Sequence, residues 1–298
     1  VLVIVGPTAS GKTALAVKLA KKFKGEIISA DSRQVYRGMD IGTGKDRAAY
    51  GRVPVHGLDL VSPKTQYTVA AYQRFAYRTI KNIIRRGKLP IIVGGTGLYI
   101  NAVVHGYQFD RQPDQKKLAA VRTQLTKWSL AKLLAKLKTV DPETYAVIDR
   151  QNRRRVQRAA EIYLTTGVKK SVADTKQAPP YRFYMVGLAV EPAVLKRRIA
   201  TRLARRLARE NMIGEVRRLH RQGVSWRRLE ALGLEYAWIA RYLQKKIDYD
   251  AMVTGLQHDI EHFAKRQMTW FKREKRIRWG KEREVIIRRI AKFLTAAA

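Results

Sequence analysis

The N-terminal third of the chain alternates between short unbroken apolar runs and longer stretches with helical spacing. Residues 12–23 continue as a helix, and residues 69–84 place apolar side chains on one face of a second helix, with Thr68 as its N-cap and Gly87 at its end. Three apolar runs are typical of strands buried on both faces of a parallel sheet: residues 1–5, 26–30 and 89–93. The alternation predicts an α/β fold, a parallel sheet flanked by helices.

The pattern changes after residue 107. Gly106, Pro113 and the polar residues between them interrupt the core pattern, and a long helical region follows. The next strand candidate lies within residues 181–190 and is followed by further helices. The sequence therefore predicts two domains: residues 1–107 together with 181–298 as the core, and residues 108–180 as a helical insertion.

A phosphate-binding motif, G-x-x-x-x-G-K-T, connects the first strand to the first helix. Gly6 and Gly11 let the backbone curl so that successive N–H groups point at an anion. Lys12 adds a positive charge, and the Thr13 hydroxyl is a standard Mg²⁺ ligand in such loops. Its place between an apolar strand and a helix favours phosphate binding over a chance Gly-rich turn. The loop alone does not identify the phosphate compound, because kinases and ATPases have the same one.

Two further strand ends are expected beside this loop. Asp31 follows the second strand, and Gly94–Thr96 follow the run at 89–93. Because the carboxyl ends of parallel strands meet at one edge of a sheet, we expect these segments to form one ligand site with the phosphate loop.

The charge balance adds a second partner class. The chain has 61 Lys and Arg residues against 24 Asp and Glu, a formal net charge of +37, which favours a polyanion as partner. RNA or DNA is the leading candidate, with acidic membranes as the rival. No apolar run approaches the roughly 18 residues of a membrane span. The chain has no cysteine, which excludes disulfides, thiolate zinc sites and cysteine nucleophiles. These features predict a cytoplasmic protein without membrane association.

Four motifs in fixed order resemble those of the tRNA dimethylallyltransferases, also called tRNA isopentenyltransferases. The resemblance runs from residue 1 to about residue 280 and includes GPTASGKT (6–13), SADSRQVYRGMDIGTGK (29–45), LPIIVGGTGLYI (89–100) and FAKRQMTWF (263–271). It implies a P-loop NTPase-like fold with a helical insertion domain that contacts tRNA. It also implies transfer of a dimethylallyl group from dimethylallyl diphosphate to the exocyclic amine of the adenine on the 3′ side of the tRNA anticodon, with release of diphosphate.

The resemblance assigns roles at the phosphate loop. Thr8 matches the residue that contacts the leaving oxygen, and Arg217 matches a diphosphate-binding arginine, while simple turn chemistry would also explain Thr8. Asp31 matches the general base, although an aspartate there could equally hold Mg²⁺ through water. Mg²⁺ is the expected cofactor, with Thr13 as its ligand. The residues expected to bind diphosphate are Gly6, Thr8, Ala9, Ser10, Gly11, Lys12 and Thr13.

The resemblance also assigns RNA contacts. Tyr99 could instead belong to the core, and for Trp270 and Phe271 we favour the core over base stacking. Gln34 suits an adenine edge. The residues expected to contact tRNA are Asp31, Ser32, Arg33, Gln34, Thr96, Tyr99, Arg154, Arg155, Arg158, Gly233, Lys265, Arg266 and Gln267.

The chain departs from the family pattern at three places that handle RNA. Gln151-Asn152 stand where the family usually has Asn-Asp, Leu234-Glu235-Tyr236 replace Tyr-[Lys/Arg]-[Glu/Gln], and Ile260-Glu261 replace Thr-Arg. The prediction is a monomeric tRNA prenyltransferase. The alternatives are a small-molecule P-loop kinase, a prenyltransferase for free adenine nucleotides and a non-catalytic RNA-binding protein.

Overall fold

The computed structural model describes residues 1–109, 115–173 and 177–295. The chain forms two compact units. Val1–Val104 and Tyr181–Ala298 make up the first unit, and His105–Pro180 make up the second. The second unit is thus inserted into the first between two of its elements.

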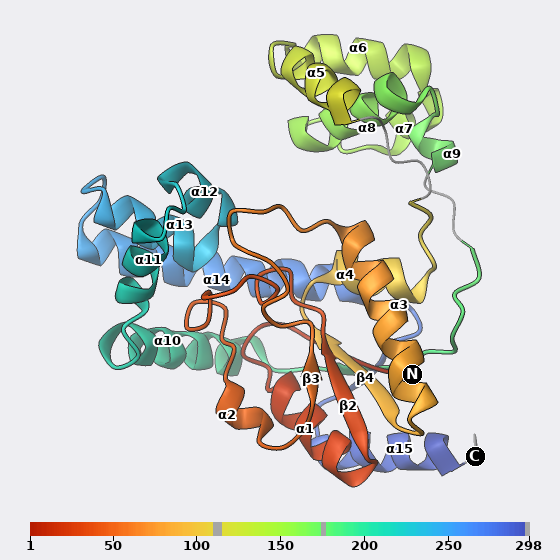
Figure 1. The fold of residues 1–298 in the computed structure, drawn as a ribbon, viewed down its shortest axis with the longest axis vertical. Coiled ribbons are helices and arrows are strands. Elements are labelled where there is room, and N and C mark those ends of the chain that lie inside the picture. The colour runs from red at the N-terminus through yellow and green to blue at the C-terminus, as the bar shows by residue number, and fades with distance from the viewer. Residues whose placement is uncertain (110–114, 174–176, 296–298) are drawn as a thin grey trace. The chain divides into compact units, whose positions relative to one another are not determined.

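The first unit is built on a parallel sheet (Figure 1). Within the described residues this sheet has six strands in the order β3-β2-β4-β1-β5-β6. Central β1 pairs on one side with β4, where Ile4 lies opposite Val93, and on the other with β5, where Ile4 lies opposite Val186. The strands are β1 (Leu2–Val5), β2 (Gly25–Ser29), β3 (Val55–His56), β4 (Leu89–Gly94), β5 (Tyr184–Leu188) and β6 (Arg278–Gly280). The predicted α/β fold with a parallel sheet is confirmed.

Both faces of the sheet are covered, because alternate strand residues belong to different hydrophobic clusters. Val3 and Ile92 contribute to the larger cluster, which includes buried residues of α3, α4 and α10–α14. Ile4 and Ile91 contribute to the smaller one, with residues of α1 and α15. The helices of this unit are α1 (Lys12–Lys22), α2 (Arg47–Tyr50), α3 (Val69–Arg85), α4 (Gly97–Val104), α10 (Pro192–Ala208), α11 (Met212–Arg221), α12 (Trp226–Leu232), α13 (Leu234–Leu243), α14 (Tyr249–Lys272) and α15 (Arg283–Thr295).

Helix α3 shows how local sequence sets an element. The Thr68 hydroxyl accepts a hydrogen bond from the Ala71 N–H at 3.1 Å, as an N-cap does. The helix ends at Arg85, and Gly87 follows with a φ of +66°, a left-handed conformation that glycine adopts without strain. Both predicted ends are therefore confirmed.

The second unit is helical and has its own small core. Buried Leu133 and Leu137 of one helix meet Val156, Ala159 and Ala160 of another. The helices are α5 (Gln115–Thr126), α6 (Leu130–Val140), α7 (Pro142–Val147), α8 (Arg153–Thr166) and α9 (Lys170–Ala173). Pro113, which was expected to interrupt the core pattern, lies outside the described residues.

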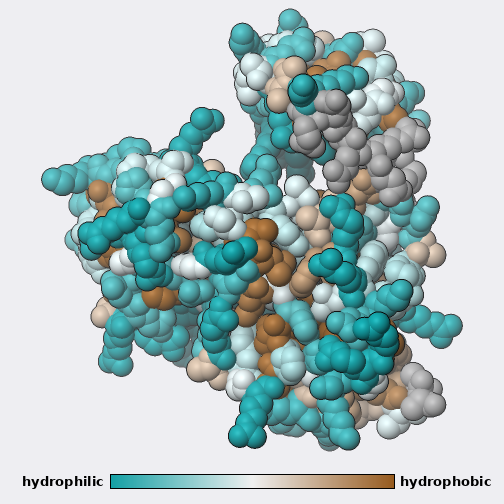
Figure 2. Space-filling view, in the orientation of Figure 1, coloured by the Kyte–Doolittle hydropathy of each residue, from teal (hydrophilic) through white to brown (hydrophobic). Residues whose placement is uncertain are grey.

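Hydrophilic side chains cover most of the face shown in Figure 2, as the excess of lysine and arginine leads one to expect. Among the helices that the structure describes, none combines the length and the apolar character that crossing a membrane requires.

Candidate active site

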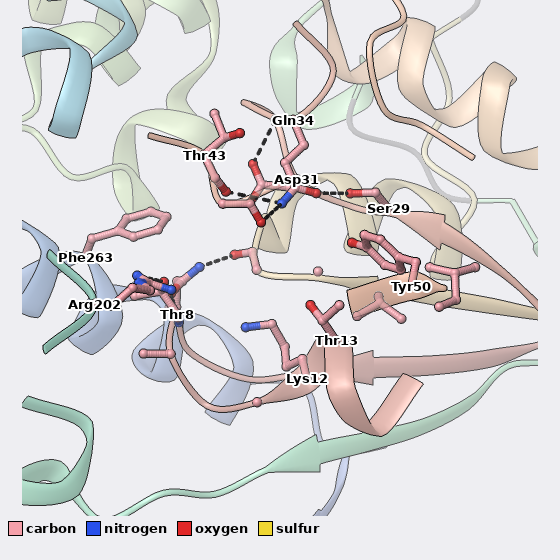
Figure 3. Close-up of a pocket in the computed structure, with 18 residues that line it drawn as sticks. Thr8, Lys12, Thr13, Ser29, Asp31, Gln34, Thr43, Tyr50, Arg202 and Phe263 are labelled. Carbon is pink, nitrogen blue, oxygen red and sulfur yellow. Dashed lines mark hydrogen bonds between the residues drawn. The ribbon is translucent and has the colours of Figure 1, made fainter. Parts of the chain in front are cut away.

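A cavity of about 210 Å³ lies where the phosphate loop meets the carboxyl ends of β2 and β4 (Figure 3). In Figure 3 Arg202 and Thr8 lie on one side of it and Tyr50 on the other, with Asp31 facing Lys12 across the space between. The predicted site residues that line the cavity are Thr8, Ala9, Gly11, Lys12, Thr13, Asp31, Gln34 and Gln267. The loop and the two strand ends thus converge as predicted.

The phosphate loop is held by its backbone conformation. Gly11 caps α1 with a φ of +89°, in the left-handed region that favours glycine. Lys12 Nζ donates a hydrogen bond to the Pro7 carbonyl at 2.6 Å. Burial lowers the pKa of Lys12 to about 7, and nearby Asp31 opposes this shift. A bound anion would favour the charged lysine, so this side chain is suited to respond to a phosphate.

Asp31 is oriented by the turn that follows β2. Its Oδ1 accepts hydrogen bonds from the N–H groups of Arg33 at 2.8 Å and Gln34 at 3.3 Å. Among the described residues, Oδ2 has no such partner and remains available to a ligand in the cavity. A carboxylate fixed through one oxygen and free at the other is suited to accept a proton.

Gln34 lines the same cavity, but its amide is engaged by the protein. Its Oε1 accepts from the Ser29 hydroxyl at 2.8 Å, and its Nε2 donates to the carbonyls of Thr43 at 3.2 Å and Gly44 at 3.4 Å. Gln34 therefore fixes the segment at Thr43 and Gly44, which also lines the cavity.

Gln267 connects three distant segments. Its Oε1 accepts from the Thr8 N–H at 2.8 Å, and its Nε2 donates to the Gly95 carbonyl at 2.9 Å. The side chain is buried. We revise the expected tRNA contact of Gln267: its amide joins the phosphate loop to the end of β4 and is not free for RNA. Its neighbours Lys265 and Arg266 are exposed.

The arginine at the cavity is Arg202, whereas Arg217, the arginine expected there, lies elsewhere. Arg202 Nη2, from α10, donates to Thr8 Oγ1 at 2.8 Å. Burial lowers the pKa of Arg202 to about 10, with a further contribution from Arg206. Arg217 is exposed on α11 and does not line the cavity. The arginine that reaches the phosphate loop therefore comes from α10 and not from α11.

The segment around Arg217 has a structural role, because its Glu215 side chain holds a neighbouring loop. This buried carboxylate accepts hydrogen bonds from the N–H groups of Asp40 at 2.8 Å, Ile41 at 2.7 Å and Gly42 at 3.1 Å. It also accepts one from the Tyr236 hydroxyl at 2.7 Å. Glu215 thus holds the loop after β2, part of which lines the cavity, and leaves Arg217 pointing outward.

A signal for Arg202 was present in the sequence of α10. Leu195, Ile199 and Arg206 are buried, and Arg202 falls on the same helical stripe at spacings of three and four. An arginine on the inward stripe of an amphipathic helix needs an anionic or hydrogen-bonding partner. Because the segment contains many other lysines and arginines, the sequence does not distinguish Arg202 from the exposed ones.

The remaining predicted residues divide between rim, core and surface. The Ser32 N–H donates to Thr96 Oγ1 at 2.9 Å, which joins the ends of β2 and β4. Tyr99 belongs to the core, since it is 4% exposed and its ring stacks on Tyr72 with centroids 4.1 Å apart. Phe271 is also buried in the core. Other predicted residues do not line the cavity: Gly6, Ser10, Arg33 and Gly233.

The arginines of α8 lie on the second unit. Arg154 and Arg155 are exposed, as is Arg158, and Val156, Ala159 and Ala160 are buried beside them. Arg158 forms an ion pair with Glu161, which Arg122 also contacts at 3.2 Å. Part of the charge of Arg158 is thus already compensated.

The oxygen atoms at the cavity fit a magnesium ion that is shared with a phosphate ligand. Thr13 and Asp31 both line it. Within the described part of the chain, no group of three or more His, Cys, Asp or Glu residues could hold a metal alone. Mg²⁺ commonly takes one or two protein ligands and completes its shell with water and substrate phosphates.

Comparison with known proteins gives one consistent result. The family model described as IPP transferase matches residues 34–274, and the one described as isopentenyl transferase matches residues 1–50. A tRNA dimethylallyltransferase 1 of Geotalea uraniireducens is 44% identical over 275 residues, which cover 92% of this chain and 89% of that protein. A tRNA dimethylallyltransferase of Treponema pallidum is 44% identical over 282 residues, covering 93% and 88%.

Solved structures agree with the sequence relatives. The tRNA isopentenylpyrophosphate transferase of Bacillus halodurans superposes with a TM-score of 0.73 at 35% identity, covering 99% of this chain and 95% of that one. A eukaryotic dimethylallyltransferase acting on tRNA gives a TM-score of 0.77 at 26% identity, covering 91% and 69%.

Proposed function

The chain belongs to the IPP transferase family, the tRNA dimethylallyltransferases, and from this premise we propose how its residues divide the work of the reaction. It is a prenyltransferase that transfers a dimethylallyl group from dimethylallyl diphosphate to tRNA and releases diphosphate. The acceptor that we propose is the exocyclic amine of the adenine on the 3′ side of the anticodon. A monomeric state and a cytoplasmic location stay predictions.

The observation that carries the proposal is the placement of an anion-binding loop opposite a half-free carboxylate in one cavity. The leaving diphosphate gains charge as its carbon–oxygen bond breaks, and the loop N–H groups with Lys12 and Arg202 would stabilise that charge. Because Thr8 Oγ1 accepts from Arg202, the hydroxyl proton of Thr8 is directed elsewhere and is available to the leaving oxygen. Arg202 thus acts partly through Thr8.

Asp31 completes the proton balance. The adenine nitrogen forms a bond to the allylic carbon, the electron pair of the broken carbon–oxygen bond leaves with diphosphate, and Asp31 accepts the amine proton. Thr13 is the residue that we propose to hold Mg²⁺, whose chemistry when bound is to neutralise charge on the diphosphate oxygens. The neighbouring Gln34 and Gln267 amides keep the cavity walls in place.

Exposed cations of both units supply the proposed tRNA contacts. Arg154 and Arg155 of α8 and Lys265 and Arg266 of α14 are all exposed. We propose that they bind RNA phosphates, since the net charge of +37 calls for a polyanion.

The reaction is tested with labelled dimethylallyl diphosphate and bulk tRNA in the presence of Mg²⁺, with labelled ATP and tRNA as the control. We expect prenylated adenine in the digested tRNA and no consumption of ATP. Formation of ADP, or tRNA without prenylated adenine, would mean that the activity has been assigned wrongly.

The pKa of Lys12 predicts how donor binding depends on pH. In the free protein this pKa is lowered to about 7, so the lysine loses its proton as pH rises above that value. The donor needs the charged form, and binding must then take up a proton. We expect donor affinity to fall between pH 7.5 and 9 by up to about tenfold per pH unit, because a phosphate ester with a pKa of about 6 no longer changes its own charge there.

Calorimetry in buffers with different ionisation enthalpies measures this proton uptake directly. Lys12→Met should bind the donor weakly and with little dependence on pH. A wild-type affinity that stays constant from pH 7.5 to 9 would show that Lys12 keeps its proton without the donor.

A further inference from the structure

Helix α15 is attached to the helix that begins at the phosphate loop. Glu284 in its first turn forms an ion pair with Lys18 of α1. Three isoleucines of α15, Ile286, Ile287 and Ile290, are buried in the cluster that contains Leu15 and Leu19 of α1. Figure 1 shows α15 beside α1. The start of α15 is therefore held close to the loop.

The first residue of α15, Arg283, lies against the loop itself. A Cβ atom built on Gly11 would lie 2.3 Å from Arg283 Nη2, so the guanidinium fills the space that a side chain on Gly11 would need. Gly11 lines the cavity and caps α1. A permanently charged group thus packs on the backbone that cradles phosphate.

The guanidinium of Arg283 has no other hydrogen-bonding or ion-pair role among the described residues. Across the part of the chain that the structure describes, no carboxylate or hydrogen-bond acceptor pairs with its guanidinium, and its side chain is exposed. Its neighbours are paired, Lys281 with Glu191 at 2.8 Å and Glu284 with Lys18. A cation placed at an anion-binding loop, with all five N–H donors free, calls for an anion that comes from outside.

The negative charge of the donor explains why an additional cation beside the loop would strengthen donor binding. A diphosphate ester carries about three negative charges near neutral pH. Lys12 and Arg202 provide two positive charges at the cavity, and Asp31 takes one away. The Mg²⁺ proposed at Thr13 would bring these charges into balance with the donor, and Arg283 beside Gly11 would add a further charge-assisted interaction with the phosphate oxygens.

We propose that Arg283 is a further diphosphate-binding residue: it stands outside the cavity lining, directly beside Gly11, and from there would reach a phosphate held by the loop. It lies beyond residues 34–274, which match the IPP transferase model, so the matched motifs do not include it. The inference rests on the proposed function, because it names an additional residue for the same donor site.

The test is calorimetric titration of inorganic diphosphate, with Mg²⁺ present, into the full chain. Loss of a charge-assisted hydrogen bond should weaken binding roughly tenfold in Arg283→Gln. Arg283→Lys, which keeps the charge, should lose less. Arg289→Gln is the matched control, since it removes an exposed arginine from the same helix and should change the affinity less than about twofold. The affinity of Arg283→Gln for tRNA should equal that of the wild type.

Equal losses in Arg283→Gln and Arg289→Gln would overturn the inference, because they would reflect the general charge of the surface. A selective loss of tRNA affinity would overturn it as well. Prenylation of tRNA by the wild type is measured alongside. If the wild type is active and Arg283→Gln binds diphosphate normally, only the inference fails. If the wild type does not prenylate tRNA but diphosphate binding depends on Arg283, the binding residue is supported and the reaction assignment fails.

Discussion

Replacing Asp31 with asparagine should lower turnover by roughly 10²–10⁴-fold and leave the affinities for tRNA and donor almost unchanged. The asparagine side chain has the same shape and can still accept from the N–H groups of Arg33 and Gln34 through its oxygen. The turn after β2 should therefore persist. What is lost is the second carboxylate oxygen, which has no partner among the described residues and which we propose takes the adenine proton.

Single-turnover prenylation measures this effect, with tRNA and donor affinities determined separately. If excess Mg²⁺ restored the rate of Asp31→Asn, the residue would be a metal ligand through water and the proton would have to go elsewhere.

The second large effect is expected for Arg202. Arg202→Gln should reduce kcat/KM for the donor by roughly 10²–10³-fold, the scale seen when one donor to a developing oxyanion is removed. The substitution removes a positive charge from the cavity and the N–H group that orients the Thr8 hydroxyl. Both changes act on the leaving group, so the reduction should appear in donor binding and in turnover.

Arg217→Gln is the matched comparison for Arg202→Gln. It removes the same charge from an exposed position on α11 and leaves the Glu215 contacts in place, so kcat/KM for the donor should change less than about twofold. Thermal unfolding of both variants separates a loss of stability from a loss of catalysis. A larger defect in Arg217→Gln than in Arg202→Gln would reinstate the motif-based assignment.

The sequence predicted the features that local chemistry determines. The glycines of the phosphate loop are needed for a left-handed conformation at Gly11, and Thr68 caps α3 through a hydrogen bond within one turn. Features of this kind depend on residues that are close in the chain, so the local sequence predicts them. Asp31 was predicted for a similar reason, since the strand end and the turn after it are adjacent in the chain.

Features that depend on distant partners were missed or misread. Gln267 was found in a motif, but its role follows from contacts to Thr8, 259 residues away, and to Gly95. Arg202 was overlooked because its role depends on its hydrogen bond to Thr8 of the phosphate loop, 194 residues away in the chain. Strands β3 and β6 have two and three residues, too few for any hydrophobic period, and become strands only through pairing at the sheet edges.

The insertion of a self-contained helical unit between α4 and β5 has a consequence for how such enzymes diverge. His105–Pro180 has its own core, and none of the residues that the structure describes in it is among those that line the cavity. Substitutions on the exposed side of α8, where we propose RNA contacts, can therefore accumulate without altering strand order, the phosphate loop or Asp31. The RNA contacts that we propose for α8 are thus encoded apart from the donor site and can change at their own rate, whereas those proposed for Lys265 and Arg266 of α14 share a unit with the catalytic residues.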